Sequence, residues 1–280
     1  MAAVLLALAA SASWGVSDFL GGLTSRRLSL ATVMAITTPL GLVVIGAVVA
    51  VRGASPPSSS FLLWGALAGV LGAVGIGSLY HGLSVGQMGV VAPISATAPL
   101  IPITFGLVRG DRPTSVQSVG IGLALVGMVL TSREHDSGSG RTRIATGAVF
   151  GLIAAAALGF SLVTLDQSAE ADPYWATLIL RGASSVAVLA VVLALRRPIR
   201  APRSYWPVLG VIAALDATGT ILFSVSTTKG LISIVAAVIA FVPVFVALLA
   251  RVFLHERLAQ IQIAGAALAI TGVALITAGG

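Results

Sequence analysis

Hydrophobic residues in this chain are gathered into long runs separated by short polar stretches. A membrane-spanning α-helix needs roughly 20 apolar residues, with a range of about 17 to 25. The runs lack the alternation of polar and apolar residues typical of strands, which favours an all-α integral membrane protein. The sequence predicts ten spanning helices, at residues 3–22, 30–51, 61–84, 89–108, 115–131, 145–166, 173–195, 205–227, 231–251 and 259–277.

The first run is apolar like a secretory signal peptide, but no positively charged segment precedes it and similar runs follow. We therefore interpret it as the first spanning helix, kept in the mature protein. The longest polar break, Ser132 to Arg143, divides the chain nearly in half. The sequence thus predicts a first domain over 1–131, a linker over 132–144 and a second domain over 145–280.

The two halves resemble each other in sequence. VQSVGIGLALVGMVL, from Val116, matches IQIAGAALAITGVAL, from Ile261, at an offset of 145 residues. Because each half has five predicted helices, an odd number, the second half must insert upside down relative to the first. This inverted repeat is typical of secondary transporters, whose substrate site lies near the bilayer midplane between the halves. Offsets of 144 or 145 residues pair Gln117 with Gln262, Gly120 with Gly265, Asp111–Arg112 with Glu256–Arg257, Gly15 with Gly159, Ser17 with Ser161, Gly86 with Gly230, and Pro99 with Pro243.

Composition supports a membrane protein. Hydrophobic residues make up 57% of the chain and charged residues only 9%, against about 25% charged in soluble domains. The net charge of +7 comes from arginines in short loops, so it indicates orientation in the membrane rather than binding of nucleic acid. The absence of cysteine excludes disulfides, thiol nucleophiles and iron–sulfur clusters within the chain.

The loop charges also predict an orientation. We call the side of the N-terminus side A and the opposite side side B. Loops on side A carry 4 lysines or arginines and those on side B carry 11, while Arg181 lies within a span. Positively charged loops stay in the cytoplasm, so we expect side B to be cytoplasmic and both termini to lie outside.

The hairpin from Ser78, SLYHGLSVGQMGVVAPISATAPLIPITFGLVRGDRPT, and that from Phe223, FSVSTTKGLISIVAAVIAFVPVFVALLARVFLHERLA, resemble the drug/metabolite transporter superfamily. Together with Trp14-Gly15, they resemble its ten-helix members with two EamA-type domains. The resemblance covers essentially the whole chain. It implies transport of small metabolites across the bacterial inner membrane, often export, and it implies cytoplasmic termini, in conflict with the charge count. Many members carry an arginine in the second helix of each half, whereas this chain has Arg181 but Thr37.

Charged and polar residues inside the predicted spans are the candidates for the transport site, because charges at bilayer depth cost about 2.5 to 3.5 kcal/mol. Asp18 and His81 are predicted at similar depth, where they could exchange a proton, although Asp18 could also cap its helix at the interface. Arg181 could form an ion pair with Asp216 or hold a substrate carboxylate by two hydrogen bonds. The predicted substrate cavity is lined by Trp14, Asp18, Tyr80, His81, Arg181 and Asp216.

Apart from glutamines near their starts, such as Gln117 and Gln262, the helices at 115–131 and 259–277 carry almost no polar side chain beyond Thr and Ser, so we expect them outside the cavity. Pro39, Pro99 and Pro243 are among the prolines predicted to interrupt spans. The chain contains no HExxH and no nucleotide-binding motif, so we expect no enzyme and no cofactor. We expect a secondary transporter of small, amino-acid-like metabolites; a passive channel and, third, an intramembrane enzyme stay open. The expected partners are a small-molecule substrate and the lipid bilayer, without nucleic acid, and a monomer is compatible with the sequence.

Overall fold

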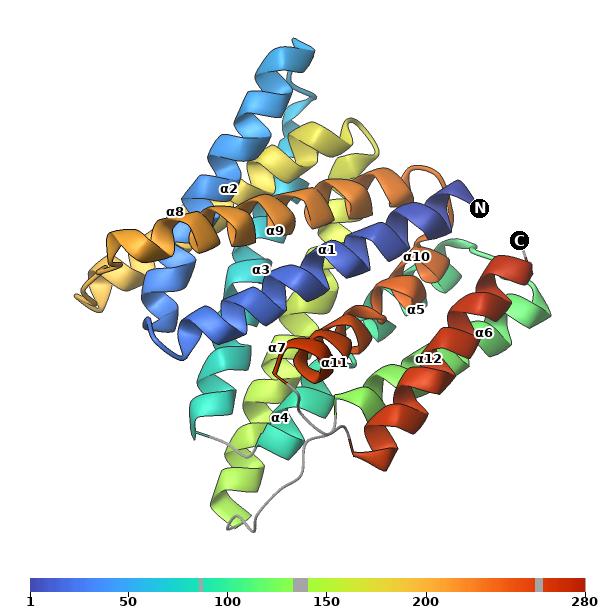
Figure 1. Cartoon of the computed structure of the whole chain (residues 1–280). Helices are drawn as coiled ribbons and strands as arrows, with labels where there is room; N and C mark the ends of the chain where they lie inside the picture. The colour runs from blue at the N-terminus through green and yellow to red at the C-terminus, as the bar shows by residue number, and fades with distance from the viewer. Residues whose placement is uncertain (86–87, 133–140, 255–258, 280) are drawn as a thin grey trace.

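The computed structural model describes residues 1–85, 88–132, 141–254 and 259–279, and within these residues the chain forms helices and no strand (Figure 1). The predicted features at Gly86 and Glu256–Arg257 and residues 133–140 of the predicted linker lie outside the described residues. The helices are α1 Ala2–Ser25, α2 Leu30–Arg52, α3 Ser59–Val85, α4 Met88–Ser95, α5 Leu100–Arg109, α6 Ser115–Thr131, α7 Arg141–Ala169, α8 Pro173–Ala194, the 3-10 turn η1 Arg203–Tyr205, α9 Trp206–Thr227, α10 Ile232–Ile239, α11 Val242–Phe253 and α12 Gln260–Ala278.

These helices give ten membrane crossings. Among the described residues, nine helical spans are long and apolar enough to cross a bilayer, and the shorter apolar helix α6 provides the tenth. All ten predicted runs are confirmed as helical. The fourth and ninth crossings are each built from two helices, α4 with α5 and α10 with α11.

The two broken crossings follow from proline. Pro99 precedes α5, and Pro243 lies in the first turn of α11. A proline donates no backbone hydrogen bond, so the helix before it cannot continue unchanged. At the breaks the backbone tightens into turns in which Thr97 N donates to Ile94 O at 3.0 Å and Phe241 N to Val238 O at 3.1 Å. The predicted interruptions at these positions are confirmed, whereas α2 continues through Pro39.

Polar caps fix several helix ends. Ser29 accepts from Thr32 N at the start of α2, and Thr114 and Gln117 form a reciprocal capping box at the start of α6. The carboxylate of Asp172 accepts from Tyr174 N and Trp175 N at the start of α8. Such caps satisfy backbone N–H groups that have no partner within the helix.

Hydrogen bonds repeat between the two halves. Ser17 Oγ on α1 donates to Ile212 O on α9 at 3.1 Å. Ser161 Oγ on α7 donates to Ala68 O on α3 at 2.7 Å. Both the donors and the acceptors differ by 144 residues, so the repeat seen in the sequence is also a repeat of inter-helix contacts. Two five-helix halves with an odd number of crossings are therefore packed as inverted repeats.

The glycines at the same offset repeat a second contact between the halves. A Cβ on Gly15 would lie 2.5 Å from Phe245 Cβ, and a Cβ on Gly159 would lie 2.8 Å from Ile101 Cβ. Phe245 and Ile101 again differ by 144 residues, and each follows the break in its crossing. The small residues thus let α1 and α7 approach the broken crossing of the opposite half closely.

Helices α6 and α12 pack on each other along one side of the molecule (Figure 1). Glycines bring their backbones together: a Cβ on Gly120 would lie 2.6 Å from Gly272 O, and one on Gly127 would lie 2.5 Å from Gly265 O. The sequence motifs that revealed the repeat therefore form this helix pair.

The main buried cluster of apolar residues occupies only the side A half of the bundle. Every residue of α10, on side A, is buried, whereas Val244 is the single buried residue of α11, on side B. Two smaller buried clusters, around Leu209 and around Val188, lie toward side B, so the largest core lies near side A. The main cluster includes Ala3, Val4, Ala7, Ala10, Ala68, Ile103, Ile121, Leu165, Ala169, Ala176, Phe223, Ile234 to Ile239 and Ile276.

Candidate functional site

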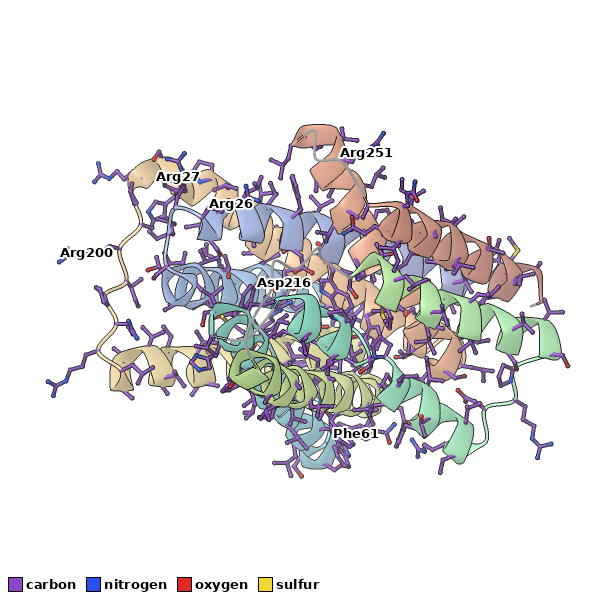
Figure 2. The ribbon with its side chains drawn as sticks, turned by 90° about the horizontal axis from the view of Figure 1, so that it is seen from below. Arg26, Arg27, Phe61, Arg200, Asp216 and Arg251 are labelled. Carbon is purple, nitrogen blue, oxygen red and sulfur yellow. The ribbon has the colours of Figure 1, made fainter. Side chains whose placement is uncertain are left out.

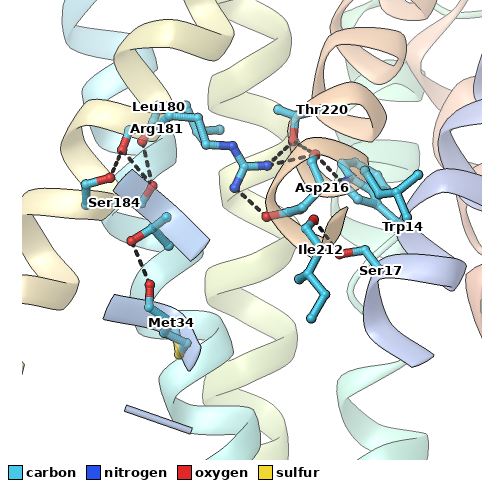
Figure 3. Close-up of polar contacts among 12 residues, drawn as sticks. Trp14, Ser17, Met34, Leu180, Arg181, Ser184, Ile212, Asp216 and Thr220 are labelled. Atoms are coloured by element: carbon cyan, nitrogen blue, oxygen red, sulfur yellow. Dashed lines mark hydrogen bonds and ion pairs between the residues drawn. The ribbon is translucent and has the colours of Figure 1, made fainter. Parts of the chain in front are cut away.

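An ion pair between Arg181 and Asp216 joins α8 to α9 in the middle of the bundle (Figures 2 and 3). Arg181 Nη1 donates to Asp216 Oδ2 at 2.5 Å, and Nη2 donates to Asp216 O at 2.8 Å and to Thr220 Oγ1 at 2.6 Å. Arg181 is only 6% exposed. Charged hydrogen bonds of this kind are stronger than neutral ones, and of the two arrangements that the sequence left open, the structure contains the ion pair.

Hydrogen bonds join α1 to α9 beside this ion pair. Trp14 Nε1 donates to Asp216 O at 3.3 Å, and Ser13 Oγ donates to Leu215 O at 2.7 Å. Gly219 makes room for the indole, since a Cβ there would lie 2.6 Å from Trp14 Cδ1. The Trp14 ring also packs against Phe223, with ring centroids 5.8 Å apart. Trp14 is thus held inside the bundle by α9 and does not lie at the membrane interface.

Two acidic side chains of the site remain accessible. Asp18 is exposed although it lies deep in the bundle, and the Asp216 side chain keeps 35% of its surface accessible. The two carboxylates are near enough for their charges to interact, and the Tyr80 hydroxyl is within range of both. The structure therefore brings five of the six predicted residues together, namely Trp14, Asp18, Tyr80, Arg181 and Asp216.

His81 has different neighbours. Its ring lies edge-on to Phe150 of α7, with centroids 4.6 Å apart. Among the described contacts, no hydrogen bond or ion pair joins His81 to Asp18. The exchange of a proton between Asp18 and His81 stays a prediction, and this conformation does not assemble the pair.

The charged residues of the site have no charged counterparts at the equivalent positions of the other half. Leu158 on α7 fits against Gly75, where a Cβ would lie 2.7 Å from Leu158 Cγ, just as Trp14 fits against Gly219. The packing of a large side chain against a glycine is therefore repeated in the two halves, but the charged residues are not. At an offset of 144 residues, Trp14, Asp18, Arg181 and Asp216 correspond to Leu158, Leu162, Thr37 and Gly72.

The sequence did not single out Thr220 or Ser13 as parts of the site. Thr220 lies one helical turn after Asp216, and its hydroxyl both donates to Asp216 O at 2.9 Å and accepts from Arg181. A spacing of four residues places two side chains on one helix face, so the position of Thr220 was available as a weak signal. The role of Ser13 depends on how α1 packs on α9, which no local pattern encodes.

A second polar group lies at the side A surface. A cavity of about 300 Å³ is lined by Asp166, Glu170, Thr227 and Thr228. Beside it, Arg109 Nη1 donates to Gln167 Oε1 at 2.7 Å and to Glu170 Oε1 at 3.4 Å, which links α5 to the end of α7.

A second link on side A joins Arg52 and Asp172. Arg52 Nη1 lies 3.0 Å from Asp172 Oδ2, and the guanidinium stacks 3.9 Å from the centre of the Tyr174 ring. Arg52 and Arg109 belong to the first half and their partners to the second. Both links therefore hold the two halves together at the surface of side A.

Three comparisons relate the chain to known proteins. It is 41% identical over 100 residues to a protein of Streptantibioticus cattleyicolor named "Probable terminal-alkyne amino-acid exporter", a match that covers 34% of this chain and 32% of that protein. A solved structure described as "Crystal structure of protein" has a TM-score of 0.82 and covers 98% of both chains, and at 18% identity it supports the fold alone. The EamA-like transporter family matches residues 1–133 and 145–278, so the chain belongs to the EamA-like transporter family.

Proposed function

We propose that this membrane transporter is a secondary carrier that exports small, amino-acid-like solutes across the bacterial inner membrane by alternating access. The observation that carries the proposal is the position of two accessible carboxylates, Asp18 and Asp216, in the middle of the bundle. A charge at bilayer depth is expensive unless it faces a partner or a water-filled space. An accessible acidic pair at this depth is therefore suited to meeting a solute.

The packing supports alternating access. The bundle is closed by its largest apolar core near side A, and the site lies beyond this core, toward side B, where the buried clusters are smaller. In carriers built from inverted repeats, one repeat moves against the other around a central site, and broken helices lie beside that site. Here the breaks before Leu100 and Val242 occupy equivalent places in the two halves.

The solute class is drawn from the partial match to a protein named as an amino-acid exporter and from the chemistry of the site. The residues proposed to line the substrate cavity are Trp14, Asp18, Tyr80, His81, Arg181 and Asp216. A passive channel is the second candidate, and the buried side A core argues against it because a channel needs a continuous path. With the loop charges placing side B in the cytoplasm, the conformation described here would accept solute from inside the cell.

Counterflow in liposomes tests the proposal. Purified protein is reconstituted in vesicles loaded with one unlabelled amino acid, and uptake of the same labelled amino acid is followed for a panel of side chains. We expect saturable uptake that overshoots equilibrium for at least one amino acid, because a carrier exchanges solutes one for one. Flux that rises linearly with concentration and shows no overshoot would instead identify a channel.

A pair of variants connects this activity to the site. Asp216→Asn keeps the shape of the side chain but removes the charge that pairs with Arg181. Asp172→Asn makes the same change in a helix cap on the side A surface, where asparagine also caps well. We expect the first variant to lose counterflow and the second to retain it. Equal counterflow in the two variants would show that transport does not depend on the proposed site.

A further inference from the structure

We propose that the site recognises a positively charged amine on its solute and that Arg181 does not contact the solute. The proposal rests on the function proposed above and adds a rule for the charge of the substrate. It follows from which charged atoms of the site are already bound to protein and which are accessible.

The guanidinium of Arg181 is bound to protein groups and hidden from the accessible space. Both terminal nitrogens donate to Asp216 or Thr220. The remaining donor, Nε, is buried, and it makes no hydrogen bond. Only 7% of the side-chain surface is accessible. A solute carboxylate therefore finds no exposed donor on Arg181 in this conformation.

The accessible charge of the site is negative. The Arg181 guanidinium is paired with Asp216, so among the described residues no cation is paired with the carboxyl group of Asp18. Asp18 forms no hydrogen bond or ion pair among the described residues, and it is exposed. A carboxylate in such a place is stabilised by a cation brought by the solute, because an unpaired charge at bilayer depth costs several kcal/mol.

The neighbouring aromatic residues suit the same ligand. The indole N–H of Trp14 is already donated to Asp216 O, so what Trp14 can offer a solute is aromatic surface. Tyr80 is half-buried and lies within charge range of both carboxylates. Aromatic rings attract ammonium groups. An alkylammonium group, such as the amine of an amino acid, therefore matches both the charged and the aromatic parts of the site.

Three derivatives that share one side chain test this rule by competition in the counterflow assay at pH 7, where an α-amino group is mostly protonated. The free amino acid carries both charges, the amino-acid amide keeps only the ammonium, and the N-acetyl amino acid keeps only the carboxylate. We expect the amide to compete within about threefold of the free amino acid, and the N-acetyl form to compete at least tenfold more weakly. N-acetyl forms that compete as well as the free amino acids overturn the proposal while leaving the carrier function intact. Absence of counterflow for every amino acid removes the proposed function and this proposal with it.

Variants at Asp18 test whether this residue causes the preference for a solute with a free amine. Because Asp18 bonds to no neighbour, Asp18→Asn should insert and fold normally, which is checked by abundance and by thermal unfolding. We expect this variant to lose the preference for the free amino acid over its N-acetyl form by at least tenfold, and Asp18→Glu to retain most of it. Asp172→Asn, a matched change on the side A surface, should leave the preference unchanged. An unchanged preference in Asp18→Asn overturns the assignment.

Discussion

Arg181 and Asp216 form an ion pair whose two members differ in access: 7% of the arginine side chain and 35% of the aspartate side chain are exposed. The cation therefore lies on the inner side of the pair and the anion on the accessible side. Arg181 therefore holds the carboxylate of Asp216 in place. Because it also donates to Thr220, it fixes the next turn of α9.

Replacing Arg181 should therefore affect stability first. We expect Arg181→Ala to lower the free energy of unfolding by about 3 kcal/mol, because removal of one partner of a buried pair leaves the other uncompensated. Arg181→Lys should cost less but still destabilise, because one ammonium cannot match the planar fork that reaches Asp216 and Thr220 together. Thermal unfolding in detergent measures both changes.

The control for this prediction is Arg52→Ala. Arg52 also pairs with an aspartate, but on the surface of side A, where its side chain is 36% exposed. Exposed pairs contribute about 0.2 to 1 kcal/mol, so this variant should unfold close to the parent protein. Arg181 variants that unfold at the parent temperature and bind solute much more weakly would restore the alternative in which Arg181 holds a substrate carboxylate.

The contact between α6 and α12 makes a second prediction about stability. A Cβ on Gly127 would lie 2.5 Å from Gly265 O, whereas a Cβ on Gly122 of the same helix would meet nothing within 4 Å. We expect Gly127→Ala to destabilise the protein by about 1 to 3 kcal/mol, the usual cost of overpacking. Gly122→Ala should be neutral or slightly stabilising, because alanine favours helix over glycine. Equal unfolding temperatures would mean that the two helices are not tightly joined.

Much of the fold was predictable from the sequence, because the length of an apolar run is a local property that the bilayer converts directly into a crossing. The inverted repeat was visible through glycine positions that form the α6–α12 contact and glutamine positions that cap these two helices. Pro99 and Pro243 indicated the breaks, since the loss of a backbone donor is also local. The domain limits at 131 and 145 stay a prediction, and α7 begins at Arg141, inside the predicted linker.

The site was predictable only as a set of residues. Charges within apolar runs marked Asp18, Arg181 and Asp216, but the partners of Arg181 include the backbone carbonyl of Asp216, which no side-chain pattern indicates. The ring of His81 lies against Phe150, because the rotation of α3 against α7 is set by packing between distant segments. The register between helices is a property of the whole bundle, and this is where prediction from the sequence ended.

The orientation in the membrane can be tested directly, because the chain has no cysteine and single cysteines can be introduced without background. Ser58 is an exposed residue of a side A loop and Ser204 is exposed on side B. In spheroplasts, a membrane-impermeant maleimide should label Ser58→Cys and should label Ser204→Cys only after lysis, as the loop charges predict. The reverse pattern would place both termini in the cytoplasm, as the resemblance to the superfamily implies.

The links across side A should control how often that side opens. Arg109 holds Gln167 and Glu170 at the end of α7, and all three side chains are exposed or partly exposed. Exposed pairs contribute about 0.2 to 1 kcal/mol, so Arg109→Ala should raise the population open to side A by no more than about fivefold. Ser226 reports this opening, because it is fully buried near the side A end of α9.

We expect a cysteine at Ser226 to react with maleimide roughly twofold to fivefold faster in the Arg109→Ala background than in the parent. A cysteine at Thr228, which is already exposed on the same side, should react at the same rate in both backgrounds. The comparison separates opening of the bundle from a general rise in reactivity, since local charge affects both positions while opening affects only the buried one. An equal rate at Ser226 would show that the apolar core of α1, α9 and α10 alone keeps side A closed, and the polar links at its surface would then contribute nothing to the transport cycle.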